Sequence, residues 1–417
     1  MKIHVWLAVV CCASFIFSSC ASAPTIQPQI NGLVIAGRFK PALKILEENK
    51  EQYGINNRLL YLLDYGLLLH LAGRYEESIP IFEEAKQIYD QLYTASLSKE
   101  AAAWLINDYF APYRGEDFER LMINVFQALN YAALDNIEEA LVEARDVDVK
   151  LGVINAQYKP DQKNVYKEDA FVRLLMGILY EASGTLEDLD NARISYQKAL
   201  ETYRNDFEPN YDLPAPSILQ ENIDELDQQK SQGQIYLIHY AGISPIKHQV
   251  SLPLPTPDGH LVALAFPFYD KRQYQESISD FKIVTSGDAQ ESQVTTELAE
   301  DIGAIATKNL DNRKARVIAK SVLRAGLKYW AEKNIENRID KNHGEGSSDW
   351  FRYIGSLYNI ASEQADLRSW QTLPDQIRLA KLSLDPGEYT VSCGAWAKHV
   401  SVSAGQTKFL IVRTANY

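Results

Sequence analysis

The side chains of this chain that could do chemistry are its histidines, cysteines and carboxylates, and their spacing is not that of a catalytic or metal site. None of the seven histidines forms a zinc-type cluster with Cys or carboxylates. His239 and His248 fall on stretches expected to be neighbouring strands, where two unrelated strand histidines are favoured over a paired site. A glycine-rich phosphate loop, a nucleophile elbow and a His-Glu-x-x-His motif are all missing from the sequence. We therefore expect no metal, no cofactor and no enzymatic activity.

The carboxylates leave one catalytic alternative open. With 55 Asp and Glu residues, a pair suited to glycoside cleavage remains an alternative, with its site in the second half of the chain. Asp301 and Asp311 flank a helical stretch, where surface ion pairs are the favoured interpretation. Cys393 has no activating neighbour in the sequence, so we expect a strand residue rather than a nucleophile.

Cys20 is the residue for which the sequence predicts a modification. Lys2 gives a positive start, and residues 5–17 form an apolar run of signal-peptide length, shorter than the roughly 20 residues that span a bilayer. With Ser18 and Ser19 before Cys20, this segment resembles a bacterial lipoprotein signal; an ordinary secretory signal is the alternative. The resemblance implies removal of residues 1–19, lipidation of Cys20 and a tether over 20–29. Ala21 implies a Gram-negative outer-membrane anchor (palmitate among its acyl chains) facing the periplasm.

Composition agrees with an exported, folded protein. Of the 417 residues, 46% are hydrophobic, which is enough for two or three domains with their own cores. The formal charge of -13, with no basic run, argues against nucleic acid as a partner. Three of the four cysteines lie at or before position 20, so the lipidated chain would keep Cys393 as its only free thiol, and an internal disulfide is excluded.

Residues 30–229 read as a helical repeat array. Four segments, beginning at Ala36, Ala72, Leu134 and Leu189, each show a turn and then a helix with a small residue early and, in most, a large one a turn later. The first two are 36 residues apart, near the 34 of a tetratricopeptide repeat, which the second segment resembles most fully. Longer spacings later imply inserted helices, one expected over 95–109.

The first helix of each repeat would line the concave face of such an array. The residues expected there form a candidate partner-binding groove and are mostly apolar: Leu60, Leu63, Leu67, His70, Met122, Val125, Leu129, Phe171, Leu174 and Ile178. An exposed apolar patch of this size is a liability for a monomer. We expect another part of this chain to fill it, with an inserted helix or an apolar helix of a partner as the alternatives.

Residues 230–417 read as a separate α+β module. Strands are expected over 234–240, 247–252, 260–268 and 281–285, with 262–268 as a central strand, and again over 378–384, 388–393, 399–403 and 408–413. Helices are expected over 297–308, 312–334 and 350–365. The basic amphipathic helix 312–334 is favoured to pack on a sheet rather than on lipid. Residues 384–412 resemble the small β-sandwich modules of envelope proteins.

Two short segments between these elements carry a structural prediction and an alternative. Residues 113–120, with Glu116 and Asp117 near the start of a helix, are favoured as a well-capped helix N-terminus over a ligand site. Glu116 and Arg120 are spaced for a side-chain pair. Residues 368–370 (Arg-Ser-Trp) are expected to seat a loop on the domain, with contact to a partner as the alternative.

Taken whole, the chain resembles a family of uncharacterised bacterial tetratricopeptide-repeat outer-membrane lipoproteins, through residues 113–148, 300–325 and 366–391. The expected fold is α+β: an N-terminal all-α solenoid, then an α+β module ending in strands. The resemblance implies a non-enzymatic, membrane-anchored periplasmic scaffold that binds another envelope protein, with a link to cell-wall synthesis. The alternative is a peptidoglycan- or glycan-binding or hydrolytic protein with its site in residues 230–417.

Overall fold

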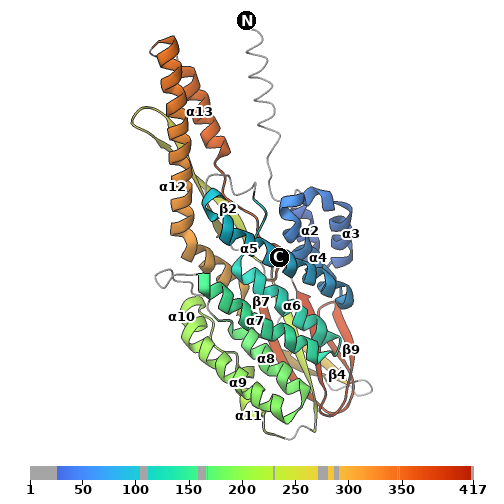
Figure 1. Ribbon diagram of the computed structural model, residues 1–417. Helices are drawn as coiled ribbons and strands as arrows, with labels where there is room; N and C mark the ends of the chain where they lie inside the picture. Colours follow the sequence, from blue (N-terminus) through green and yellow to red (C-terminus); the bar gives the residue numbers. More distant parts are fainter. Residues whose placement is uncertain are drawn as a thin grey trace.

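A computed structural model describes residues 26–103, 111–157, 166, 168–228, 231–270, 280–285, 291–344, 346 and 348–414. The protein is α+β, with helices in the N-terminal half and most strands in the C-terminal half (Figure 1). Cys20 and the signal segment lie outside the described residues. Within the described residues, no helix is long and apolar enough to cross a membrane.

The N-terminal half consists of consecutive helical hairpins: α2 (Gln27–Ile35) with α3 (Phe39–Glu48), α4 (Arg58–Leu71) with α5 (Tyr75–Ala103), α6 (Asp117–Ala133) with α7 (Ile137–Gln157), and α8 (Ala170–Ser183) with α9 (Leu186–Thr202). The short helices η1 (Lys50–Tyr53) and η2 (Ile55–Asn57) precede α4, and η4 (Tyr203–Phe207), α10 (Glu208–Tyr211) and α11 (Ser217–Glu225) complete this half. Gly37, Gly73 and Asp135 have left-handed backbone at three of the expected repeat turns.

Two expectations about this half are corrected. The tether over 20–29 was expected to lack helix, yet α2 begins at Gln27, whose neighbour Pro28 suits a helix start. Residues 95–103 belong to the continuous helix α5 rather than to a separate inserted helix. The remainder of that expected helix, residues 104–109, lies outside the described residues.

Small residues let the paired helices approach closely, as the repeat pattern requires. A Cβ placed on Gly177 of α8 would lie 2.3 Å from the ring of Tyr196 on α9, and one on Gly66 of α4 would lie 2.7 Å from the ring of Phe82 on α5. Both aromatic side chains are fully buried. The aromatic ring therefore occupies the space that any larger residue would need.

Gly177→Ala is expected to lower the free energy of unfolding by about 1 to 3 kcal/mol, since overpacking forces the helices apart. The matched control is Gly152→Ala in α7, where an added Cβ meets nothing within 4 Å. That substitution should be neutral or stabilising by up to about 1 kcal/mol. Urea denaturation of both variants checks the prediction, and equal stabilities would contradict the close packing of α8 on α9.

Two four-stranded sheets face each other in the C-terminal half. The first has the order β10 (Thr407–Thr414), β1 (Gly233–Ala241), β7 (Gln376–Leu384), β6 (Glu297–Asp301), with β1 and β10 parallel. The second has the order β5 (Glu291–Thr295), β4 (Asp280–Thr285), β8 (Gly387–Cys393), β9 (Trp396–Val402). Side chains of β1 alternate between two cores. Ile235 and Leu237 pack toward the second sheet, whereas Tyr236, Ile238 and Tyr240 join the core of the helical half.

A long helical pair projects from this body as an arm (Figure 1). Helix α12 (Ile302–His343) has 42 residues and is therefore about 63 Å long at 1.5 Å per residue. Asp301 caps its start by accepting a hydrogen bond from the Ala304 amide. Helix α13 (Asp349–Ser362) returns along it, and the two-stranded ribbon β2 (Ile246–Pro255) and β3 (Leu261–Asp270) packs on both helices. We call α12, α13 and this ribbon the arm.

Three strand and helix expectations are wrong. Residues 262–268 do not form a central strand, because β3 pairs with β2 alone and its apolar residues face the arm helices instead. The helix expected over 297–308 begins only at Ile302, since residues 297–301 form the edge strand β6. Strand β5 was not expected. The other expected strands and the helices around 312–334 and 350–365 are present.

Candidate functional site: a closed groove and an exposed arm

The ten residues of the candidate groove all line the core. Each is at most 2% exposed: Leu60, Leu63, Leu67, His70, Met122, Val125, Leu129, Phe171, Leu174 and Ile178. The first sheet covers them, with β10 against α4 and α6, and β6 against α8. The expectation that the chain fills its own groove is met in this structure. The prediction that these residues form an exposed surface for a partner is corrected, because strands of the second half cover them.

Polar contacts join the groove to the sheet. His70 donates through Nδ1 to Asn130 Oδ1 at 2.6 Å, so its Nε2 accepts from the Tyr240 hydroxyl at 2.9 Å. Burial lowers the pKa of His70 to about 4, which keeps the ring neutral. Thr372, in the linker before β7, donates to Asp64 of α4 at 2.7 Å. These bonds satisfy groups that would otherwise be costly to bury.

Residues 366–373 seat the linker between α13 and β7 on the helical half. Trp370 is fully buried between Phe82 and Phe126, with ring centroids 6.1 and 5.7 Å away, and its amide donates to Glu119 at 2.8 Å. Arg368 donates to Asn57 and to the carbonyl of Ala111. The expectation that Arg-Ser-Trp seats a loop is confirmed.

Glu119 is the carboxylate at the centre of this seat. It accepts from the Glu116 amide as part of a capping box on α6, and also from the Tyr113 hydroxyl. Burial raises the pKa of Glu119 to about 7 despite these bonds. The well-capped helix start expected at Glu116 is confirmed. The Glu116 carboxylate is bonded to Lys247 and Arg313, and Arg120 is bonded to Asp90, rather than forming the expected pair.

Two further buried carboxyl groups, those of Asp169 and Glu300, lie where α8 meets β6. Asp169 caps α8 by accepting from the Val172 amide, and also accepts from the Tyr166 hydroxyl. Glu300 is fully buried, with neither carboxylate oxygen hydrogen-bonded among the described residues. Burial, with the nearby charge of Asp169, raises the pKa of Glu300 well above its usual value. Neither residue lines a described cavity, which is unlike the accessible carboxyl pair of a glycoside hydrolase.

The Glu300→Gln variant is expected to lose less stability than the wild type as the pH is raised. The raised pKa means that folded Glu300 holds a proton that the unfolded chain releases, so the free energy of unfolding falls as pH rises above the unfolded value. Between about pH 6.5 and 8.5 the other titrating groups, the histidines included, are common to the wild type and the variant, so their contribution cancels in the comparison. There the wild type should lose on the order of 1 kcal/mol more than the variant. Thermal unfolding across this range checks it, with the exposed Glu388→Gln as control; parallel curves for wild type and Glu300→Gln would contradict the burial.

The other residues considered for chemistry have structural surroundings. His239 is buried between Thr296 and Thr414, and β1 does not pair with the strand of His248, so the two histidines are unrelated as favoured. Cys393 is a buried strand residue, and burial raises the pKa of its thiol. Among the described residues, no group of three His, Cys, Asp or Glu is arranged to hold a metal ion.

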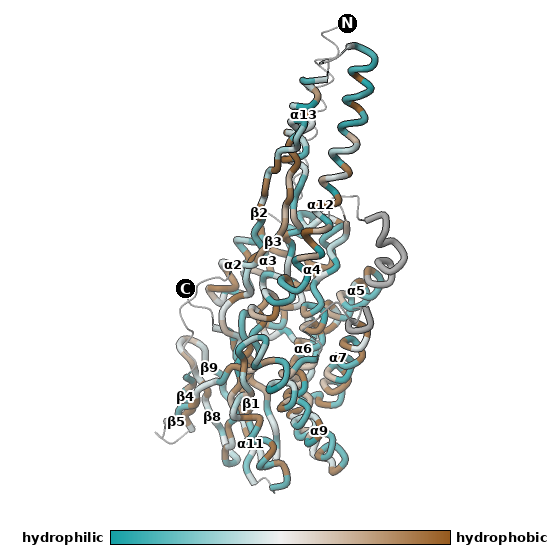
Figure 2. Tube along the Cα trace, turned by 90° about the vertical axis from the view of Figure 1, so that its left-hand side faces the viewer, coloured by the Kyte–Doolittle hydropathy of each residue, from teal (hydrophilic) through white to brown (hydrophobic). Residues whose placement is uncertain are grey.

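The arm carries most of the large apolar side chains that the described residues expose. On α13 these form a helical stripe, with Trp350 57%, Tyr353 77% and Leu357 61% exposed. Others on the three arm elements are Leu252, Leu254, Leu261, Phe268, Val322, Leu323, Leu327, Trp330, Ile335, Ile354, Tyr358 and Ile360. Figure 2 shows hydrophobic colouring along the ribbon β2–β3 beside the largely hydrophilic α12. Large apolar side chains exposed on one part of a folded chain are a feature of interaction sites and of aggregation-prone surfaces.

The arm is also basic within an acidic chain. Helix α12 contains ten Lys and Arg against four Asp and Glu, a formal charge of +6, whereas the whole chain has -13. Helix α13 has one Asp and one Arg and is neutral. The exposed aromatic stripe thus lies on a neutral helix beside a positively charged one.

Buried polar contacts fix the arm internally. His260, at the turn of the ribbon, lies 3.0 Å from Glu336 and 3.6 Å from Glu332 on α12. Near the base, Glu363 accepts from Arg324, and Ser321 accepts from the Ala265 amide. The hydrogen bonds of His260 with Glu336, of Arg324 with Glu363 and of Ala265 with Ser321 are buried and therefore hold the ribbon and α12 in a fixed arrangement.

Comparison with known proteins gives no relative from which to transfer a function. No protein-family model matches this chain, and no curated protein matches it. Function must therefore be argued from the arm and the body themselves.

Sequence reasoning missed the arm as the exposed surface. The basic helix over 312–334 packs on the β2–β3 ribbon, as favoured, yet Val322, Leu327 and Trp330 of its apolar stripe remain exposed. The stripe of Trp350, Tyr353 and Leu357 has helical spacing too, yet spacing cannot tell a buried face from an exposed one.

Proposed function

We propose that this protein is a non-enzymatic scaffold of the cell envelope that binds a partner protein through its arm. The observation that carries the proposal is the exposed stripe of Trp350, Tyr353 and Leu357 on α13. Trp and Tyr are enriched among the residues that dominate binding at protein interfaces. The lipid anchor at Cys20 and the periplasmic location belong to the proposal, as do the tetratricopeptide-like nature of the helical hairpins and a link to cell-wall synthesis.

The partner we propose is a protein with an apolar groove bordered by acidic residues. Anchors spaced three and four residues apart on one helix suit a groove that receives a helix. The charge of +6 on α12 would attract acidic side chains around that groove, and would repel the same helix of a second copy. The exposed stripe of α13 lies on a neutral helix, which favours a protein groove, whereas basic α12 exposes Val322, Leu327 and Trp330 beside its Lys and Arg as a lipid-binding helix does.

Lysine-reactive crosslinking in intact cells, followed by mass spectrometry, tests the proposal. The supporting result is a reproducible crosslink from arm lysines, such as Lys314 or Lys341, to lysines that border an acidic surface of one envelope protein. Crosslinks that join only residues of this chain, or two copies of the arm, would contradict it. Flotation of unlipidated protein with vesicles of anionic lipid is the companion measurement, because flotation that needs no partner would assign the arm to the membrane instead.

A further inference from the structure

The interior of the arm is polar, whereas its large apolar side chains are exposed. Once the first turns of α12 are set aside, up to Leu310, the buried apolar residues described in the arm are all small: Ala263, Ala265, Pro267 and Ala325. Burial of apolar area therefore contributes less to the cohesion of the arm than to that of the body. The contacts between buried polar groups must supply more of it.

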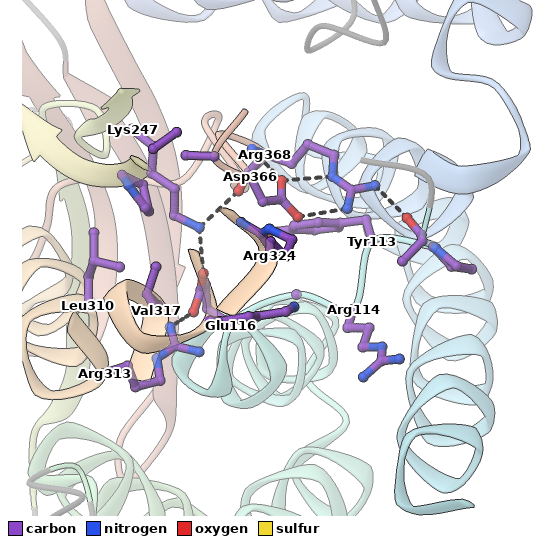
Figure 3. A pocket seen from close by; sticks show the side chains of 17 residues that line it. Tyr113, Arg114, Glu116, Lys247, Leu310, Arg313, Val317, Arg324, Asp366 and Arg368 are labelled. Carbon is purple, nitrogen blue, oxygen red and sulfur yellow. Dashed lines mark hydrogen bonds and ion pairs between the residues drawn. The ribbon is translucent and has the colours of Figure 1, made fainter. Parts of the chain in front are cut away.

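Two sets of polar contacts hold the ribbon β2–β3, one toward each end. At the base, Lys247 of β2 and Arg313 of α12 both bond the Glu116 carboxylate of the body (Figure 3). At the outer end, His260, beside the turn between β2 and β3, contacts Glu336 of α12 at 3.0 Å. At 1.5 Å per residue, about 35 Å of α12 separates Arg313 from Glu336. The outer contacts can therefore open while the base stays fixed.

The buried imidazole of His260 is surrounded by three carboxylates. Its Nε2 lies 3.0 Å from Glu336 Oε2 and 3.8 Å from Asp258 Oδ2, and its Nδ1 lies 3.6 Å from Glu332 Oε2. The other charged or titratable side chains around this cluster are Lys328, Tyr329, Lys333, Asp349 and Arg352. Lys333 bonds both Asp258 and Glu336, and Arg352 of α13 bonds Glu336. The cluster therefore joins the ribbon to both arm helices.

Two atoms of this cluster face each other without a hydrogen bond. Nδ1 of His260 and Oε2 of Glu332 are both buried, and neither has a hydrogen-bond partner among the described residues. A neutral ring that donates from Nε2 to Glu336 turns the lone pair of Nδ1 toward this carboxylate oxygen. A Cβ placed on Gly355 of α13 would lie 2.7 Å from Oε1 of Glu332, so the carboxylate is packed in place. A proton held by either atom converts this unfavourable contact into a hydrogen bond.

We propose that a proton shared by His260 and Glu332 makes the arm sensitive to pH: it holds the turn of the ribbon on α12, and its loss as the pH rises releases that turn. Burial raises the pKa of Glu332, which favours the proton in the folded arm. A proton that the folded arm holds and the opened arm gives up stabilises the closed arm at low pH, and this stabilisation is lost as the pH rises. Histidine changes its charge between about pH 5 and 8, which sets the range of the response.

The consequence for binding rests on the proposed function of the arm. Arg352 lies on α13 between Trp350 and Tyr353 of the exposed stripe, and it bonds the same cluster through Glu336. Release of the ribbon therefore loosens the helix that presents the stripe. Mildly acidic conditions would favour the arrangement that binds the partner.

Hydrogen–deuterium exchange of the purified full chain, corrected for the pH dependence of intrinsic exchange, tests the proposal without a partner. Protection of the amides at the outer end of the ribbon, residues 252–264, should fall at least tenfold between about pH 5.5 and 8, because one proton changes an equilibrium by up to about tenfold per pH unit. Residues 246–249, next to the Glu116 contacts, should change less. No fall at the outer end, or an equal fall at both ends, would overturn the proposal.

Three variants assign the response to this proton. Glu332→Gln gives Nδ1 of a neutral His260 a permanent amide donor, so residues 252–264 should stay protected at both pH values. His260→Gln removes the ring and should abolish the response. The control is His248→Gln, an exposed histidine of the same ribbon, which should respond as the wild type does. A response that persists in Glu332→Gln or His260→Gln, or a Glu332→Gln ribbon that is unprotected at pH 5.5, would overturn the proposal. Since this experiment contains no partner, its failure would leave the proposed function standing, and a failure of the crosslinks in cells would leave the exchange result standing.

Discussion

Replacing Trp370 with alanine is expected to lower the free energy of unfolding of the whole chain by about 3 to 5 kcal/mol. The indole is fully buried between Phe82 and Phe126 of the helical half, although it comes from the linker that leads into the sheet. Its loss leaves a cavity in the core shared by both halves. Such a change is a large part of the 5 to 15 kcal/mol by which most domains are stable.

The exposed Trp330→Ala is the matched control, and should change stability by less than about 0.5 kcal/mol. Urea denaturation followed by circular dichroism reports the helices, and the fluorescence of Trp396, which packs on Phe281 and is kept in both variants, reports the second sheet. In Trp370→Ala the two transitions should move together to lower urea. Helices that keep their wild-type midpoint while the sheet unfolds first would show two independent cores, contrary to the shared one.

The triple variant Trp350→Ala, Tyr353→Ala, Leu357→Ala is expected to lose the arm's crosslinks to its partner, with at least a tenfold fall in yield. Truncation of a central interface residue commonly costs 2 kcal/mol or more, and 1.4 kcal/mol is tenfold in affinity. Alanine is the best helix former, so α13 should persist. All three side chains are more than half exposed, so folding should not suffer.

A triple substitution outside the arm provides the control for this result. Ile55, Leu186 and Ile194 are exposed by 90, 86 and 51%, and all three lie in the helical half. Their replacement by alanine should leave the crosslinks intact. If the arm variant crosslinks as well as the wild type, or if both triple variants lose the partner equally, then α13 is not the docking surface.

Local sequence signals predicted much of the fold. The mostly apolar run of β1 and the turns at Gly37 and Gly73 depend on nearest neighbours, so they could be recognised without the rest of the chain. The small and large residues of each repeat helix were likewise visible as repeat spacing, whereas the contact of Gly177 with Tyr196 on the neighbouring helix was not predicted. Residues 297–301 were mistaken for helix because an edge strand of acidic and small residues has no strong strand period.

The candidate site depended on contacts that the sequence does not display. The apolar groove and the apolar arm have the same helical spacing, and only the position of the sheet decides which is covered. That position follows from pairings such as His70 with Tyr240, which are 170 residues apart. The ion pairs of Glu116 with Lys247 and Arg313 could not be foreseen for the same reason, since these residues meet only after the arm has folded onto the body.

Thiol labelling of engineered cysteines tests most directly the claim that the arm, and not the groove, is the surface open to a partner. Leu357→Cys lies on the arm and Leu67→Cys in the groove, and the buried Cys393 of the wild type supplies the background. In purified protein, after subtraction of the labelling of the wild type, the arm cysteine should react as fast as a free thiol, and the groove cysteine only at the rate of unfolding. In intact envelopes the arm cysteine should become protected. Rapid labelling of Leu67→Cys in the folded protein, or an arm cysteine equally reactive in both settings, would contradict the account.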